Sequence, residues 1–172
     1  MKISPVLYRV VEVLIVIAVG VLLFITTYPQ YKDIKEKNLM ADVKTNMYFL
    51  QAAVEHYIAD NFGKLPKSVD DIVSYIEQEG GFPVNPCTKR PLTRVDIREG
   101  KYEYPWMVRD EDPNGPNGKW EGAPGTMMYI TFTPENAEEP FDYAIIGFGA
   151  DGKPLFYLDS AKKKKIFVLH KE

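Results

Sequence analysis

The sequence has little cysteine and no stripe of positive charge. Its 172 residues include one cysteine, Cys87, so a disulfide within the chain is excluded. No histidine or lysine–histidine pair flanks Cys87, so we expect a buried, unreactive thiol, or an intermolecular bridge if the domain is exported. The net charge is −3 and bases alternate with acids, which argues against nucleic acid as a partner. One basic block, residues 162–165, is typical of a solvated hairpin turn.

Motifs for catalysis are also missing. There is no glycine-rich phosphate loop, no Ser/His/Asp grouping and no Cys/His cluster. His56 and His170 are far apart and lie in no metal-ligand spacing. Trp106 and Trp120 are more typical of a core or an interface than of a ligand cage. We therefore expect a protein that is not an enzyme.

An apolar run occupies residues 10–28 and contains a single acid, Glu12. Its length is close to what a helix needs to cross the ~30 Å hydrocarbon core of a bilayer. Lys2 and Arg9 precede the run, but no small-x-small cleavage site follows it. This pattern favours a retained single-pass anchor over a secretory signal, with the N-terminus in the cytoplasm and the remaining domain outside it. An ionised acid in hydrocarbon costs roughly 2.5–3.5 kcal/mol, so Glu12 needs a partner or a function.

The chain from Tyr31 to Asn61 contains neither glycine nor proline, and it has helical periodicity. Apolar residues recur every three or four positions, which places them on one helix face: Leu39, Met40, Val43, Met47, Leu50, Val54, Tyr57 and Ile58. Asn61-Phe62-Gly63 supplies a stop signal. The sequence therefore predicts one helix of about fifty residues, kinked at most at Pro29.

The rest of the chain predicts a small sheet. Ser68 is typical of the N-cap of a short helix, with Asp71 three residues later and Gly80-Gly81 at its end. Strand-like runs follow, with a turn at Asp151-Gly152; they are residues 102–108, 127–133, 143–148, 155–158 and 166–169. An antiparallel sheet packed on the amphipathic half of the long helix gives an α+β fold. We divide the chain into a leader-like segment (1–7), a membrane half (8–31) and an amphipathic half (32–62) of the helix, and a globular domain (63–172).

The N-terminal residues resemble those of type IV pilins and type II secretion pseudopilins. In that family an acid precedes a proline by seventeen residues in an apolar helix, and Glu12 and Pro29 have this spacing. The match to the family extends into residues 51–57. Residues 82–86 and 143–155 resemble the major-pseudopilin branch. The resemblance implies a pilin-like fold and a homopolymeric filament of helix-packed subunits. It also implies related pilin-like subunits, an inner-membrane assembly machinery and membrane lipid as partners.

The family pattern places the processing site between Leu7 and Tyr8, but Leu7 replaces the glycine that the family has before the cut. The resemblance implies that Glu12 pairs with the free amine of Tyr8 on a neighbouring subunit. If residues 1–7 stay attached, Arg9 or Lys2 of a neighbour is the available cation. Alternatively, Glu12 lies at headgroup depth, unpaired or paired with Arg9 of its own helix. The missing glycine favours a second reading, an unprocessed, membrane-anchored binding protein that does not polymerise.

A second pattern, between residues 110 and 121, matches a calcium-binding loop. Asp110, Asp112 and Asn114 alternate, Gly115 permits a turn, and Glu121 closes the pattern D-x-[DN]-x-[DN]-G-x5-E. Major pseudopilins hold calcium in a loop of their sheet region, so the resemblance implies Ca²⁺ at this place. The alternative is a plain surface turn, because aspartate, asparagine, glycine and proline also favour turns without a metal.

Overall fold

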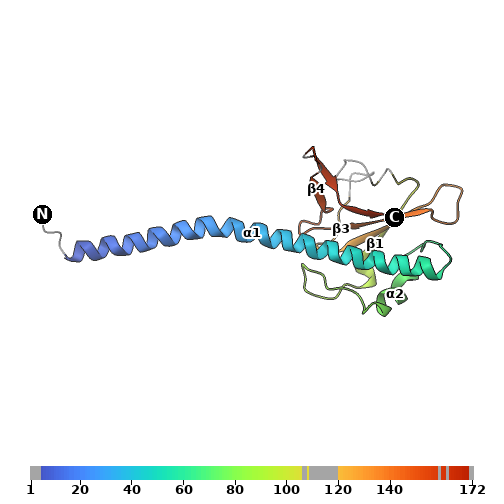
Figure 1. The fold of residues 1–172 in the computed structure, drawn as a ribbon, viewed down its shortest axis with the longest axis horizontal. Coiled ribbons are helices and arrows are strands. Elements are labelled where there is room, and N and C mark those ends of the chain that lie inside the picture. The colour runs from blue at the N-terminus through green and yellow to red at the C-terminus, as the bar shows by residue number, and fades with distance from the viewer. Residues whose placement is uncertain (1–4, 106–107, 109–119, 159, 162, 171–172) are drawn as a thin grey trace. The chain divides into compact units, whose positions relative to one another are not determined.

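The computed structural model describes residues 5–105, 108, 120–158, 160–161 and 163–170. Its residues form two compact units, Met1–Asn38 and Leu39–Glu172. Helix α1 (Pro5–Asp60) begins in the first unit and ends in the second (Figure 1). The expected α+β layout is confirmed, since a long N-terminal helix packs its second half on a small sheet.

In the first unit, the described residues belong to α1. Pro5 lies in the first turn, where a missing N–H costs nothing. Pro29 lies inside the helix, and α1 continues through it. Because proline has no N–H, the Ile25 carbonyl loses its usual helical donor. One turn earlier, the Thr26 hydroxyl donates to the carbonyls of Leu22 and Leu23 at 3.0 and 3.1 Å.

In the second unit, the predicted apolar face of α1 lies in the core. Val43, Met47, Leu50 and Val54 are at most 1% exposed. The helix contacts β3 (Asp142–Gly147) closely, because a Cβ added at Gly147 would lie 2.6 Å from Val43 Cγ1. The side chains of α1 thus lie directly against the strand backbone at this point.

The predicted stop at residues 61–63 is confirmed. The N–H of Gly63 donates to the carbonyl of Ile58 at 2.9 Å, and Gly63 has a φ of +83°. The preceding residue, Phe62, is also left-handed with a φ of +57°, so this bond closes a Schellman-type cap in which Phe62 occupies the C′ position where glycine is favoured.

The predicted short helix is present, but its start differs from the expectation. A 3-10 turn, η1 (Asp70–Ile72), leads into α2 (Val73–Gln78), and the Ser68 side chain does not cap it. Instead the Asp71 carboxylate accepts the backbone N–H groups of Lys67 and Ser68 at 2.8 and 3.0 Å. A carboxylate accepts two donors more strongly than a hydroxyl accepts one, so Asp71 orders this turn. The predicted end at Gly80-Gly81 is confirmed, with positive φ at both.

The main sheet is mixed, so the expectation of an antiparallel sheet is wrong. Its order is β1-β2-β3-β6, formed by β1 (Ile97–Tyr102), β2 (Met127–Phe132), β3 and β6 (Val168–His170). β1 pairs with β2 in parallel, while β3 is antiparallel to β2 and to β6. The expected strand at 102–108 is also wrong, because β1 ends at Tyr102. This edge strand has no apolar pattern, because its interior residues are Arg98, Glu99, Gly100 and Lys101.

A separate hairpin pairs β4 (Phe156–Leu158) with β5 (Lys164–Ile166). The run expected at 166–169 is divided between β5 and β6, and Phe167 between them donates its N–H to the Leu155 carbonyl at 2.7 Å. Of the basic block, Lys163 immediately precedes β5, Lys164 and Lys165 belong to β5, and Lys162 lies outside the described residues. The turn predicted at Asp151-Gly152 is confirmed, with Gly152 at a φ of +73°.

The sheet is buried on both faces. One core cluster joins α1, the 65–76 segment and one face of the sheet, and the other contains Trp120, Ile130, Phe132 and Ile166. Trp120 is 6% exposed and donates its indole N–H to the Tyr102 hydroxyl at 3.1 Å, as expected for a core aromatic. Trp106 lies outside the described residues. Double-sided burial explains why β2 and β3 are nearly continuous apolar runs.

Candidate assembly interface

The predicted assembly residues occupy the beginning of α1. Tyr8 lies four residues and Arg9 three residues before Glu12, so both lie one turn from Glu12 on its side of the helix. All three side chains are exposed. Glu12 forms no ion pair with any residue that the structure describes, Arg9 included.

The apolar side chains around Glu12 are also exposed. Between Tyr8 and Tyr31, the large apolar side chains are 46–67% exposed, and no face of this part of α1 is covered within its unit. By length and composition, α1 is the one helix among the described residues that is long and apolar enough to span a membrane. Such a surface is not stable in water and needs lipid or protein around it.

The three residues predicted for processing (Leu7 and Tyr8) and bending (Pro29) lie within the same helix. The backbone of Leu7 is helical, and Tyr8 follows it with a side chain that is 67% exposed. Pro29 marks the point where the helix loses one backbone hydrogen bond.

The predicted calcium ligands fall mostly outside the described residues. Asp110, Asp112 and Asn114 lie in the undescribed segment, and Glu121 is exposed. The Glu121 carbonyl accepts a hydrogen bond from Arg98 Nη1. Glu121 also lines a cavity of about 370 Å³ together with Asp96 and Arg98. Within the described ranges, no group of three or more His, Cys, Asp or Glu side chains converges on a metal position.

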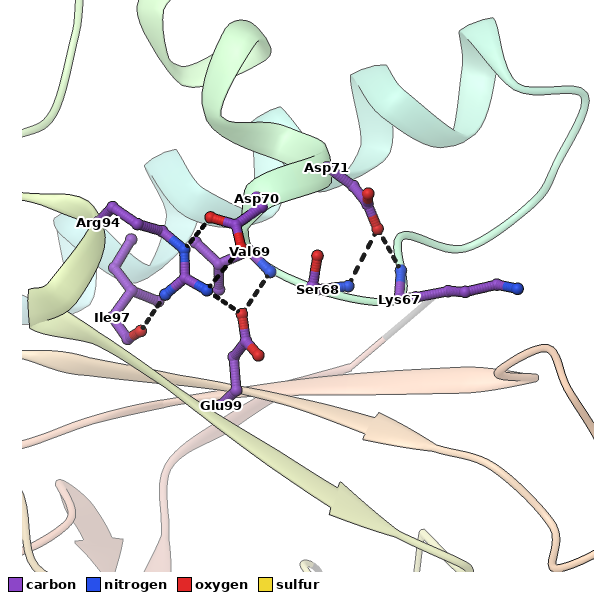
Figure 2. A network of polar contacts seen from close by, with 8 residues as sticks. All are labelled: Lys67, Ser68, Val69, Asp70, Asp71, Arg94, Ile97 and Glu99. Atoms are coloured by element: carbon purple, nitrogen blue, oxygen red, sulfur yellow. Dashed lines mark hydrogen bonds and ion pairs between the residues drawn. The ribbon is translucent and has the colours of Figure 1, made fainter.

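A polar cluster around Arg94 connects the 67–71 segment to β1 (Figure 2). This cluster was not predicted from the sequence. Arg94 Nε lies 2.5 Å from Asp70 Oδ1, and Arg94 Nη2 lies 2.5 Å from Glu99 Oε1. Glu99 Oε1 also accepts the Val69 N–H at 2.8 Å. The hydrogen bond from Arg94 lowers the pKa of Asp70, and Asp70 in turn raises the pKa of Arg94. The cluster joins side chains from separate segments of the chain, so no spacing of neighbouring residues in the sequence predicts it.

Two buried asparagines fasten the 82–92 loop. Asn46, on α1, donates to the Val84 carbonyl at 2.9 Å. Asn85 donates to the Pro124 carbonyl at 3.0 Å and accepts the N–H groups of Cys87 and Thr88 at 2.8 and 3.1 Å. Burial raises the pKa of the half-buried Cys87 thiol, which agrees with an unreactive side chain. These groups order the loop and offer no evident chemistry of their own.

Comparison of the chain with protein-family models, with curated proteins and with solved structures gives no match.

Proposed function

We propose that this chain is a structural subunit of a type IV pilus-like or type II secretion pseudopilus-like filament. The observation that carries the proposal is the contrast between the two halves of α1. From Val43 to Val54 the apolar face is buried in the second unit, whereas from Tyr8 to Tyr31 the apolar side chains are exposed. The exposed half serves as a membrane anchor before assembly and as the packing surface between subunits afterwards.

The energetics of this half suit exchange between lipid and protein. Lipid tails and neighbouring apolar helices solvate Val, Leu and Ile side chains about equally, so little hydrophobic energy opposes transfer from one to the other. The exception is Glu12, which costs roughly 2.5–3.5 kcal/mol in hydrocarbon when ionised. A cation from a neighbouring subunit offsets that cost only in the assembled state. In this proposal Glu12 therefore favours assembly and sets the axial position of one helix against the next.

The identity of that cation depends on processing before Tyr8. A cut there supplies the amine of Tyr8, and an intact chain supplies Arg9 or Lys2. In either form, the partners are further copies of this chain, related pilin-like subunits, an inner-membrane assembly machinery and lipid.

A second candidate is a membrane-anchored binding protein that remains monomeric. Leu7, in the place of the glycine expected before the cut, is the observation that favours it. Here the exposed half of α1 serves only as an anchor.

Two measurements on membranes that contain the full chain separate these candidates. Mass spectrometry of the N-terminus identifies the mature first residue, and ultracentrifugation of sheared or detergent-released material measures polymer. A free amine at Tyr8 together with sedimenting polymer is the expected result for the filament subunit. An intact Met1 with no polymer at any protein concentration would overturn the filament and support the monomeric anchor.

A further inference from the structure

The two ends of the apolar run in α1 carry different side chains from its middle. At the start, Tyr8 is 67% exposed and Arg9 is exposed. At the other end, Tyr28 and Tyr31 are 58% and 63% exposed, and an exposed Lys32 follows them. Each end thus combines a tyrosine hydroxyl with a cation. We call Tyr8 and Arg9 the near belt, and Tyr28, Tyr31 and Lys32 the far belt.

The segment between the belts lacks these kinds of side chain. Residues 10–27 include no tyrosine, tryptophan, lysine or arginine, and Glu12 is their one charged residue. Phe24, their one aromatic residue, is 66% exposed and has no polar group. The Thr26 hydroxyl donates to two carbonyls of the preceding turn, at 3.0 and 3.1 Å, so it does not require water. The middle of the run therefore presents an almost wholly apolar surface.

The spacing of the belts matches the thickness of a bilayer. Tyr31 follows Tyr8 by twenty-three residues, and Lys32 follows Arg9 by the same number, which corresponds to about 34 Å of helix. With a tilt of about 20°, which is usual for a membrane-spanning helix, the same residues span about 32 Å along the bilayer normal. The hydrocarbon core is about 30 Å thick. Both belts can therefore lie just outside the hydrocarbon at the same time.

The chemistry of the far belt suits the headgroup region. Tyr31 and Lys32 lie three and four residues after Tyr28, so all three share one side of the helix. The Tyr28 ring stacks on the Phe24 ring, with centroids 5.4 Å apart and planes at 24°. An apolar ring thus lies on the hydrocarbon side of a ring that has a hydroxyl. Tyrosine and lysine side chains favour this boundary because each has an apolar part and a polar end.

Pro29 lies within the far belt. The Ile25 carbonyl, which has no helical donor because of Pro29, points along the axis toward the level of Pro29. In hydrocarbon an unpaired carbonyl is costly, because no water is present to donate a hydrogen bond. At the headgroup boundary water supplies that donor. The far belt therefore coincides with the one turn of this half that benefits from contact with water.

We propose that the near and far belts bind the two headgroup regions of a lipid bilayer and fix the depth of α1, with Val19 and Gly20 at the midplane. The inference rests on the membrane anchor of the proposed function and assigns its lipid contacts to particular residues. Glu12 then lies about 4.5 Å along the axis beyond Arg9, inside the near edge of the hydrocarbon. A helix held at both boundaries resists sliding along the bilayer normal.

Spin labels along α1 measure this depth directly. The full chain is reconstituted in vesicles of phosphatidylcholine and phosphatidylglycerol, and single cysteines are introduced in a Cys87→Ser background. The labelled positions leave both belts intact: Val10, Val13, Val16, Val19, Leu23, Thr27 and Ile34. Oxygen concentrates in hydrocarbon and a nickel chelate stays in water, so the ratio of their collisions with the label reports depth. The expected maximum lies between residues 18 and 21, and a maximum outside this range would overturn the proposal.

Removal of the far belt gives a second, independent readout. Tyr28→Leu/Tyr31→Leu/Lys32→Leu lengthens the apolar run at one end, so the depth maximum should move by about two residues toward the C-terminus. Lys37→Leu/Tyr48→Leu is the matched control, because it replaces the same two residue types at exposed positions of α1 beyond the belt. The control should leave the maximum in place. A maximum that stays in place in the triple variant, or moves equally in both variants, would contradict the role of the belt.

These results also separate the belts from the anchor itself. If every label is open to the nickel chelate, α1 does not insert, and the anchor and the belts fail together. If α1 inserts with its maximum outside residues 18–21, or if the triple variant does not shift it, the belts fail and the anchor stands. Neither measurement depends on polymer, so the filament function is tested separately by sedimentation.

Discussion

Arg94 Nε lies 2.5 Å from Asp70 Oδ1, although the two residues are twenty-four positions apart in the chain. This bond, with the second one to Asp70 Oδ2 at 3.2 Å, holds the start of η1 against η2 (Arg94–Asp96), the 3-10 turn that leads into β1. The same bond lowers the pKa of Asp70 below its usual 3.8. Because the folded state favours the ionised form, the Asp70 carboxylate stabilises the fold at pH values above the pKa that Asp70 has in the unfolded chain. That contribution to stability is lost as the pH falls through the lower pKa that Asp70 has in the folded protein.

Asp70→Asn should therefore lower the free energy of unfolding at pH 7, and the difference from the unaltered chain should shrink as the pH drops below about 4. Urea unfolding followed by tryptophan fluorescence at several pH values measures it. Asp42→Asn is the control, since Asp42 is an exposed helical aspartate with no ion pair among the described residues. A difference that stays constant from pH 7 to pH 2 would refute the role of the carboxylate.

Replacing Asn85 by leucine should destabilise the second unit by about 2–3 kcal/mol. The substitution leaves the N–H groups of Cys87 and Thr88 and the carbonyl of Pro124 without their partners. Asn136→Leu, in an exposed turn, should change stability by less than about 0.5 kcal/mol. Equal effects of the two substitutions would show that the Asn85 bonds contribute little.

Phe62 should be replaceable with a gain in stability. Its φ is +57°, a left-handed conformation that bulky residues rarely adopt, and its side chain is 98% exposed. Phe62→Gly should raise the free energy of unfolding by about 0.5–1 kcal/mol, because glycine relieves the backbone and no packing is lost. Phe62→Ala keeps the Cβ and should change little. If both variants lower the melting temperature, the ring has a stabilising contact that this conformation does not show.

Charge reversal at Glu12 should abolish assembly and leave membrane insertion intact. Glu12→Lys places a cation where the proposal requires an anion, so sedimenting polymer should fall at least about tenfold, while alkali-resistant membrane association stays unchanged. Glu36→Lys, later in α1, is the matched control and should still polymerise. Polymer from Glu12→Lys at the level of the control would disprove the pairing.

Calcium should stabilise the chain if residues 110–121 form the predicted loop. At a hundredfold excess over its dissociation constant, a bound ion adds about 2.7 kcal/mol. A chelator should then lower the melting temperature of the unaltered chain and leave that of Asp110→Ala/Asp112→Ala unchanged. No effect of the chelator on the unaltered chain would favour the plain surface turn.

The helices were predictable from sequence because their signals are local. The spacing of Val43, Met47, Leu50 and Val54 defines a helix face, and Gly63 marks its end. The strands β2 and β3 were also found, because burial on both faces makes them apolar throughout. The edge strand β1 was missed, since Arg98, Glu99 and Lys101 give it no apolar pattern.

Long-range polar contacts could not be found in this way. Nothing in the neighbourhood of Arg94 indicates Asp70 as its partner, and nothing around Asn85 indicates Pro124. The parallel pairing of β1 with β2 is of the same kind, because it depends on how the chain crosses between residues 103 and 126. Glu12, Tyr8, Arg9 and Pro29 could be selected from sequence, but their roles depend on neighbouring subunits and stay predictions.

Pro29 has a mechanical consequence for any load that the exposed half of α1 carries. A tension applied there travels along one continuous helix to Val43 and Met47, which are held against the backbone of β3 at Gly147. Along this path the helix is most compliant at the turn between Ile25 and Pro29, where a backbone hydrogen bond is missing. Each residue that unwinds there lengthens the chain by about 2 Å, since a helical residue rises 1.5 Å and an extended one about 3.5 Å. Stretching would therefore begin at this turn, and the core of the second unit would be spared until the turn had opened.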